Sequence, residues 1–180
     1  MQAVDFTLAG VDGCKGGWIA VLANGLLTLP RVQAFPRFAD ILQTCPSLQV
    51  IAIDIPIGLL DKEPGERACD KAARAVLGPR RSSVFPAPRR FLLGVSPHAK
   101  ANELSKSAIV KGLSKQAYNI TAKVQDVDAT VRGYRHGLVK EVHPEVSFWA
   151  MNGRQAMVSN KKTRPGIAER VTLLRVCLGN

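Results

Sequence analysis

Four acidic residues come at the end of apolar segments of the chain or directly after them. They are Asp12, Asp54, Glu141 and Glu145. The clearest case is Asp54, which interrupts the apolar run VIAIDIPIG at residues 50–58. An ionised carboxylate is costly to bury unless it is paired or binds a metal ion. Asp54 therefore has either a hydrogen-bonded structural role or a place at a strand end where it serves a site.

Clustered carboxylates repel one another, so a group of them persists only where cations or protons neutralise it. Oxygen ligands of this kind suit Mg²⁺ or Mn²⁺. Two such ions about 4 Å apart would hold both oxygens of an in-line phosphoryl displacement. If the strands carrying these acids are neighbours, the sequence predicts a metal site at which Asp12, Asp54, Glu141 and Glu145 are both metal ligands and catalytic residues. The alternative for each acid is a local cap or turn.

The elements that must position these acids follow from apolar runs and turn residues. Apolar runs predict five strands, over residues 6–11, 18–22, 26–35, 50–57 and 138–142. Prolines at expected helix starts and glycines at expected helix ends help to predict helices. These cover residues 37–44, 64–77, 97–111, 115–134, 144–151 and 165–178. The first strands are joined by hairpins and the later ones by connections that contain helices. This order predicts a mixed five-stranded sheet flanked by helices, an α/β fold. We expect one domain over residues 1–180.

Composition narrows the possible partners. Among 180 residues there are 25 Lys and Arg against 14 Asp and Glu, a formal net charge of +11. Such a charge favours a polyanion such as nucleic acid, although a basic surface without a partner is the alternative. No apolar run is long enough to span a bilayer, and the N-terminus has no secretory signal pattern, so we expect no membrane partner. Four scattered cysteines suggest neither a zinc site nor a disulfide scaffold, which favours the cytoplasm.

Polar residues suited to phosphate gather in three segments. Candidates for binding a nucleic-acid backbone are Arg67, Arg74, Arg80, Arg81, Ser82, Ser83, Lys161 and Lys162. Asp70 falls between two of these arginines at helical spacing and could hold their guanidinium groups in place. His143, between the two acids of EVHPE, could orient a water or a phosphate. The alternatives are an ordinary surface charge network and, for His143, a structural hydrogen bond.

Six ordered segments resemble the DUF429 family of predicted RNase H-like nucleases. They are GVDGCKGGWIAV (Gly10–Val21), IDIPIGL (Ile53–Leu59), RACDKAARAVLGPRRSSVFPAP (Arg67–Pro88), KVQDVD (Lys123–Asp128), EVHPEVSF (Glu141–Phe148) and SNKKTRPGIAER (Ser159–Arg170). The resemblance implies an RNase H-like fold. It also implies that Asp12 is similar to the first-strand catalytic aspartate of such enzymes, and that Asp54, Glu141 and Glu145 match further acids of the family.

Members of this family continue into a final helix with an acidic D-x-x-D-A-like motif. The last helix expected here lacks that motif and carries only Glu169. We therefore expect the domain to lack the family's acidic C-terminal helix, and to bind one divalent ion tightly and a second weakly or not at all.

Together these features predict a metal-dependent nuclease that hydrolyses phosphodiester bonds in nucleic acid. Mg²⁺ or Mn²⁺ would be held by Asp12, Asp54 and Glu141 or Glu145, and a metal-bound water would attack phosphorus. Two alternatives remain. One is a catalytically inert nucleic-acid-binding domain. The other is an actin-like or sugar-kinase-like phosphotransferase, which normally needs two such domains.

Overall fold

The structure is a computed structural model that describes residues 5–25, 30–132 and 137–179. The chain divides into two compact units. Unit 1 is built from Met1–Pro64 and Ala87–Val142, and unit 2 from Gly65–Pro86 and His143–Asn180. Each unit therefore combines two stretches of chain that are distant in sequence.

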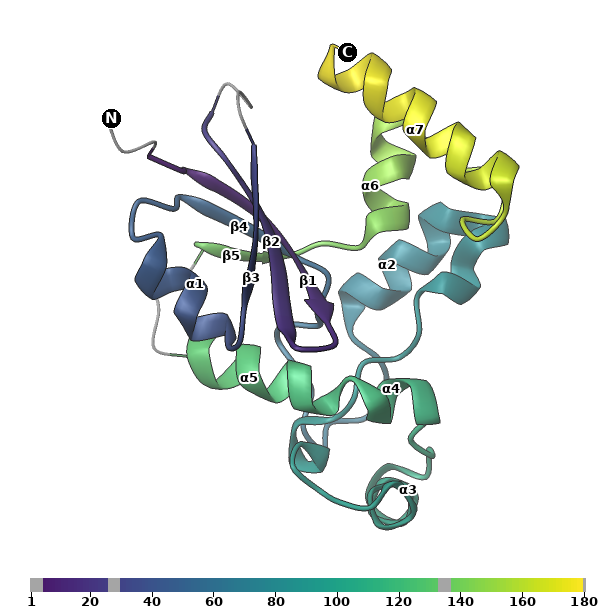
Figure 1. Cartoon of the computed structure of the whole chain (residues 1–180). Helices are drawn as coiled ribbons and strands as arrows, with labels where there is room; N and C mark the ends of the chain where they lie inside the picture. The colour runs from purple at the N-terminus through teal and green to yellow at the C-terminus, as the bar shows by residue number, and fades with distance from the viewer. Residues whose placement is uncertain (1–4, 26–29, 133–136, 180) are drawn as a thin grey trace. The chain divides into compact units, whose positions relative to one another are not determined.

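Unit 1 contains a five-stranded mixed sheet (Figure 1). Its strands are β1 (Leu8–Cys14), β2 (Gly17–Ala23), β3 (Arg31–Phe35), β4 (Val50–Ile53) and β5 (Val139–Glu141). Their order across the sheet is β3-β2-β1-β4-β5. The first three strands are antiparallel, whereas β4 is parallel to β1 and β5 is parallel to β4. The expected mixed five-stranded α/β fold is confirmed, and the strands that carry Asp12, Asp54 and Glu141 are neighbours.

The hairpin between β1 and β2 is tight, and a glycine is required where it closes. Gly17 has φ +145°, and a Cβ atom placed on it would lie 2.1 Å from the carbonyl oxygen of Phe35. The next residue, Trp18, is fully buried and donates its Nε1–H to Asp126 Oδ2 at 2.7 Å. Asp126 also accepts the backbone N–H of Phe38 at 2.9 Å, so one carboxylate joins the hairpin and the helix that carries Asp126 to the helix that begins at Phe38.

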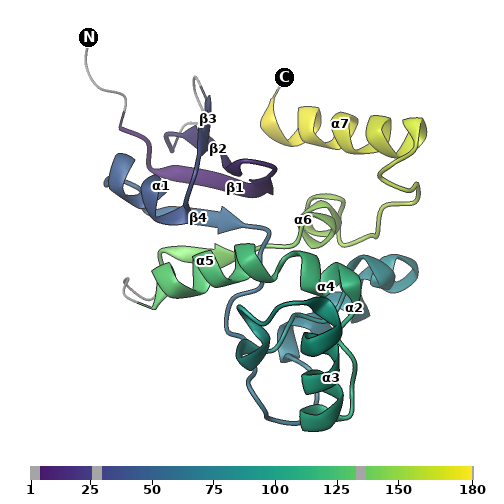
Figure 2. The same cartoon turned by 60° about the horizontal axis from the view of Figure 1, so that its bottom comes forward.

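Helices cover one face of this sheet. The helical segments of unit 1 are α1 (Phe38–Thr44), the short helix η2 (Arg90–Leu92), α3 (His98–Ile109), α4 (Lys115–Asn119) and α5 (Thr121–Val131). The core cluster joins α1 and α5 to the inward residues of the strands, among them Val11 and Ile53 (Figures 1 and 2). Strand residues alternate between faces, so Ile19 and Val21 point to the opposite face, where they are 41% and 46% exposed.

Unit 2 is helical. Its elements are α2 (Ala68–Leu77), the 3-10 helix η1 (Gly78–Ser83), α6 (Pro144–Met151) and α7 (Arg164–Leu178). Helix α6 packs against both α2 and α7 (Figure 1). Among the helices of the described residues, none combines the length and the apolar character that a membrane crossing requires.

Several element boundaries differ from those expected. The strand β1 continues past Val11 to Cys14, because its pairing with β2 extends beyond its pairing with β4. The strand β4 ends at Ile53, which leaves Asp54 just outside it. Helix α2 starts four residues after Pro64, and the long helix expected from Lys115 is divided into α4 and α5. Residues 26–29 of the expected third strand and residues 133–134 of that long helix lie outside the described residues.

Candidate functional site

Three of the predicted acids meet at one end of the unit 1 sheet. In the parallel register Val11 pairs with Ile53, and Ile53 pairs with Glu141. Asp12 and Asp54 are the next residues on β1 and after β4, and the N–H of Asp54 donates to the carbonyl oxygen of Val11 at 3.3 Å. Neighbouring strands lie about 4.8 Å apart. The backbones of Asp12 and Asp54 are therefore adjacent, and both residues are exposed.

The alternation of faces separates Glu141 from this pair. Because Glu141 is in register with the buried Ile53, it starts from the sheet face that α1 and α5 cover. Asp12 and Asp54 come one residue further along and start from the opposite face. Asp12 and Asp54 are therefore the two acids whose side chains leave the sheet on the same side.

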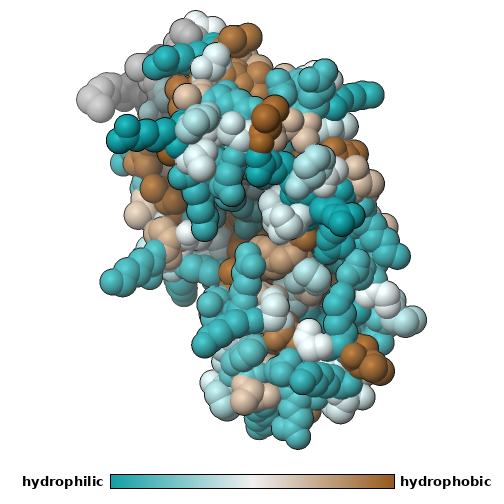
Figure 3. Space-filling model, turned by 90° about the vertical axis from the view of Figure 1, so that its right-hand side faces the viewer, coloured by the Kyte–Doolittle hydropathy of each residue, from teal (hydrophilic) through white to brown (hydrophobic). Residues whose placement is uncertain are grey.

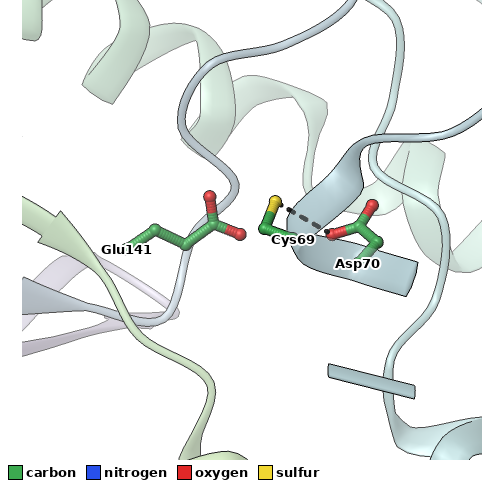
Figure 4. A group of neighbouring side chains, drawn as sticks. All are labelled: Cys69, Asp70 and Glu141. Atoms are coloured by element: carbon green, nitrogen blue, oxygen red, sulfur yellow. Dashed lines mark hydrogen bonds between the residues drawn. The ribbon is translucent and has the colours of Figure 1, made fainter. Parts of the chain in front are cut away.

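Local hydrogen bonds hold two of these carboxylates. Asp12 Oδ1 accepts the N–H of Gly13 at 2.7 Å. Glu141, at the end of β5 (Figure 4), accepts the N–H of Ile57 at 2.8 Å, which fixes the segment after β4. A carboxylate oxygen has more than one lone pair, so neither contact prevents binding to a cation.

The fourth acid, Glu145, is in unit 2 and has a different environment. It lies in the first turn of α6, as expected, but it is only 3% exposed. Its two carboxylate oxygens accept the NH2 group of Arg170 at 2.9 and 2.7 Å. Arg170 also donates NH1 to the carbonyl oxygens of Gly166 and Ser159. A metal ion at Glu145 would have to compete with this buried guanidinium.

The predicted phosphate-binding arginines of α2 also have protein partners. Arg67 Nε donates to Asp70 Oδ2 at 3.1 Å, and both side chains are buried. Arg74 donates NH1 to Glu66 at 2.8 Å and Nε to the carbonyl oxygen of Val84 at 2.9 Å. The sequence placed Asp70 beside both arginines, whereas the structure pairs it with Arg67. Cys69 Sγ makes a long contact of 3.8 Å with Asp70 (Figure 4).

The segment after α2 is held by side chains that sequence analysis assigned to phosphate. Arg80 donates Nε to the carbonyl oxygen of Met157 at 3.1 Å and NH2 to that of Val158. Ser83 Oγ donates to the carbonyl oxygen of Arg80 at 2.8 Å. His143 Nε2 lies 3.2 Å from the carbonyl oxygen of Ser83 and donates to it. These contacts match the structural alternative for His143 and fix η1 against the loop before α7.

The remaining candidates for phosphate binding lie on the surface. Arg81, Ser82, Lys161 and Lys162 are exposed. Arg80 links η1 to residues 157–158, so the segments carrying Arg81 and the two lysines belong to one part of unit 2. The face drawn in Figure 3 is largely hydrophilic, and its hydrophobic side chains form small separate patches.

Glu169 supports the loop before α7. Its carboxylate accepts the N–H of Val158 at 2.8 Å and that of Ser159 at 3.0 Å. These donors, with Arg170 and Arg80 nearby, lower the pKa of Glu169 from its usual value. The carboxylate of Glu169 is therefore already hydrogen-bonded within unit 2, to the loop before α7.

Two groups of charged residues were missed by sequence analysis. Arg170 forms the ion pair with Glu145, and their separation of 25 positions in the sequence gave no signal of it. Asp128 accepts Arg90 NH1 and lies 3.1 Å from Arg132 NH2, beside a cavity of unit 1. The four-residue spacing of Asp128 and Arg132 on a predicted helix indicates a contact, but nothing in the sequence brings Arg90 to it.

The sheet order and the strand-end acids define an α/β protein with a mixed five-stranded sheet and an exposed aspartate pair at the carboxyl ends of β1 and β4. The chain belongs to the DUF429 family, described as a protein of unknown function, whose model matches residues 10–178. This confirms the family expected from the sequence, while the nuclease activity remains a prediction. Neither the comparison with curated proteins nor that with solved structures found a match.

Proposed function

We propose that this protein is a divalent-metal-dependent nuclease that hydrolyses phosphodiester bonds in nucleic acid. The observation that supports the proposal most directly is the pair Asp12 and Asp54, exposed on adjacent parallel strands and starting from the same face of the sheet. Mg²⁺ keeps several waters and typically takes one or two protein carboxylates. Such a pair therefore fits one Mg²⁺ or Mn²⁺ ion.

The roles of the residues follow from this geometry. Asp12 and Asp54 would hold the ion. Glu141 starts from the other face of the sheet and would support the site by holding the segment after β4 through the N–H of Ile57. The bound ion supplies a nucleophilic water at neutral pH and charge stabilisation for the developing phosphorane. The net charge of +11 would draw the polyanionic substrate to the protein. We place the activity in the cytoplasm, since none of the four cysteines, all of them among the described residues, forms a disulfide.

A catalytically inert nucleic-acid-binding protein is the second candidate. The observation that favours it is the ion pair between Glu145 and Arg170, which leaves one predicted acid of the metal site with a different partner. This candidate keeps the basic surface and predicts binding without hydrolysis.

The experiment that tests the proposal combines metal binding with hydrolysis. Titration calorimetry with Mg²⁺ and Mn²⁺, and thermal unfolding with and without metal, are measured on the whole chain and on Asp12→Asn and Asp54→Asn. An ion present at a hundred times its Kd adds about 2.7 kcal/mol of stability, or about 5–10 °C in Tm for a chain of this size. We expect both variants to lose this shift and to keep or gain stability without metal, because each removes one of two repelling charges.

Hydrolysis is followed on labelled single-stranded and duplex oligonucleotides. The matched control is Glu103→Gln, which neutralises an exposed acid on α3 far along the chain from the strand ends. We expect this control to cleave like the original protein and Asp12→Asn not to cleave. Metal binding by Asp12→Asn equal to that of the control would overturn the assigned site. Nucleic-acid binding with no metal-dependent hydrolysis in any form would favour the inert candidate.

A further inference from the structure

Unit 1 contains a cavity of about 330 Å³ whose wall includes Ile57, three residues after Asp54. Its walls come from the segment after β4, from α5 and from β5, and they include Ile57, Val127, Val131 and Val139. Ligand pockets in proteins are typically about 300–1,000 Å³. This cavity is at the small end of that range and suits a ligand of about one ring system.

The cavity has an apolar interior and a charged edge. Val127 is only 1% exposed, whereas the side chains of Arg90 and Arg132 are 30% and 61% exposed. Asp128 lies between these arginines, with Arg90 NH1 at 2.7 and 2.6 Å from its two oxygens. One carboxylate between two guanidinium groups leaves one net positive charge. The cavity therefore fits a ligand with a flat apolar body and an attached anionic group.

The segment that follows β4 carries both Asp54 of the proposed metal site and part of the cavity wall. Ile57 lines the cavity and donates its N–H to Glu141, and Val139 is two residues before Glu141 on β5. Asp54 precedes Ile57 by three residues, which span at most about 11 Å. Val127 and Val139 place the cavity on the sheet face that α5 covers, so a nucleic acid whose base enters the cavity must pass around the end of β4 to reach Asp12 and Asp54 on the other face.

We propose that the cavity receives one unpaired base of the nucleic acid whose backbone is bound at Asp12 and Asp54. This inference rests on the proposed nuclease function and defines its substrate as single-stranded, or unpaired at the cleaved position. Apolar side chains contact the faces of an unstacked base, and arginine can contact its phosphate or stack on it. A base in a duplex must first leave its stack and its pair, so a duplex should bind less tightly than a single strand.

The first test measures binding, without cleavage, to a labelled single strand and to its blunt duplex at one salt concentration. It uses Asp12→Asn protein, alone and combined with Val131→Phe, which fills the cavity, or with Arg132→Glu, which reverses a charge at its edge. Arg175→Glu is the matched control, because Arg175 is an exposed arginine in the last turn of α7. We expect the single strand to bind at least about tenfold more tightly than the duplex, and both cavity variants but not the control to reduce this preference.

The second test does not depend on a filled core position. Methyl NMR of the whole chain is recorded during titration with adenosine 5′-monophosphate and, separately, with hexanoate. We expect the nucleotide to shift the methyl signals of Val127, Val131 and Val139. Shifts of these signals by hexanoate but not by the nucleotide would overturn the inference and assign the cavity to small amphipathic acids.

The outcomes separate this inference from the nuclease proposal. Equal binding of single strand and duplex, unchanged by Val131→Phe and Arg132→Glu, would overturn the base-binding cavity even if Mg²⁺-dependent hydrolysis is found. Nucleotide-induced shifts of the three valines without any hydrolysis would support the cavity and overturn the nuclease.

Discussion

At the scale of single residues, the four predicted acids have two kinds of environment. Asp12 and Asp54 are exposed near the ends of adjacent strands. Glu145 is buried against Arg170, which provides the positive charge itself. The carboxylates are therefore exposed in unit 1, whereas that of Glu145 in unit 2 is already ion-paired.

This difference gives a prediction for Glu145→Gln. The substitution removes the close counter-charge of the Arg170 guanidinium, which is 7% exposed, and leaves only Glu169 at 3.9 Å. Removing one partner of a buried ion pair typically costs about 3–5 kcal/mol. We expect a loss of this size in the free energy of unfolding, measured with urea, and an unchanged affinity for Mg²⁺.

Glu103→Gln serves again as the control and should leave stability within about 0.5 kcal/mol of the original. Full stability of Glu145→Gln combined with weaker metal binding would contradict this assignment. It would then show that Glu145 is a metal ligand and that its pairing with Arg170 is weak.

At the scale of elements, the sequence predicted the strands and turns that local residue patterns determine. The apolar run at residues 50–53 and the hairpin glycines identify β4, β1 and β2, and strand adjacency then places Asp12 beside Asp54. The contacts of Arg80, His143 and Arg170 could not be predicted, because each joins segments that are distant in sequence and follow no periodic pattern. The face from which Glu141 starts depends on the parallel register, where a shift of one residue reverses it.

The attachment of α7 to the loop before it should depend on pH through Glu169. Its pKa is lowered chiefly by the N–H of Val158, with further contributions from Ser159, Arg170 and Arg80. A group whose pKa is lower in the folded state stabilises that state above its unfolded pKa, and this contribution is lost as the pH falls through the folded value. We therefore expect Glu169→Gln to reduce Tm at pH 7 and to have less effect as the solution becomes more acidic than the lowered pKa.

Thermal unfolding of the two proteins over a pH series measures this difference. The two Tm curves should converge on the acidic side. A constant gap at all pH values would show that the loss comes from the amide NH2 of Gln, which cannot accept one of the N–H groups of Val158 and Ser159, and not from the charge of Glu169.

At the scale of the whole molecule, the net charge of +11 must be separated into residues that bind other parts of the protein and residues that remain for a partner. Arg67, Arg80 and Arg170 donate to carboxylates or carbonyl oxygens within unit 2. Arg81, Lys161 and Lys162 are exposed, on the two segments that Arg80 joins. If the protein binds nucleic acid, as proposed, we predict that its phosphates contact this second set.

Salt dependence tests this division. Each phosphate contact to a single strand contributes about 0.7 to the slope of log affinity against log salt, because binding releases condensed counterions. Reversing the charge of Arg81, Lys161 and Lys162 together should flatten that slope by about 2 if all three contact phosphate. Reversing Lys100, an exposed lysine on α3, should leave the slope unchanged. Arg80 is kept intact in this comparison, because its loss would release the loop at residues 157–158 and change affinity through folding.

If the triple variant and Lys100→Glu have the same slope as the original protein, the basic residues of unit 2 are not the nucleic-acid surface. Phosphate binding would then be assigned to the edge of the cavity in unit 1, where Arg90 and Arg132 lie.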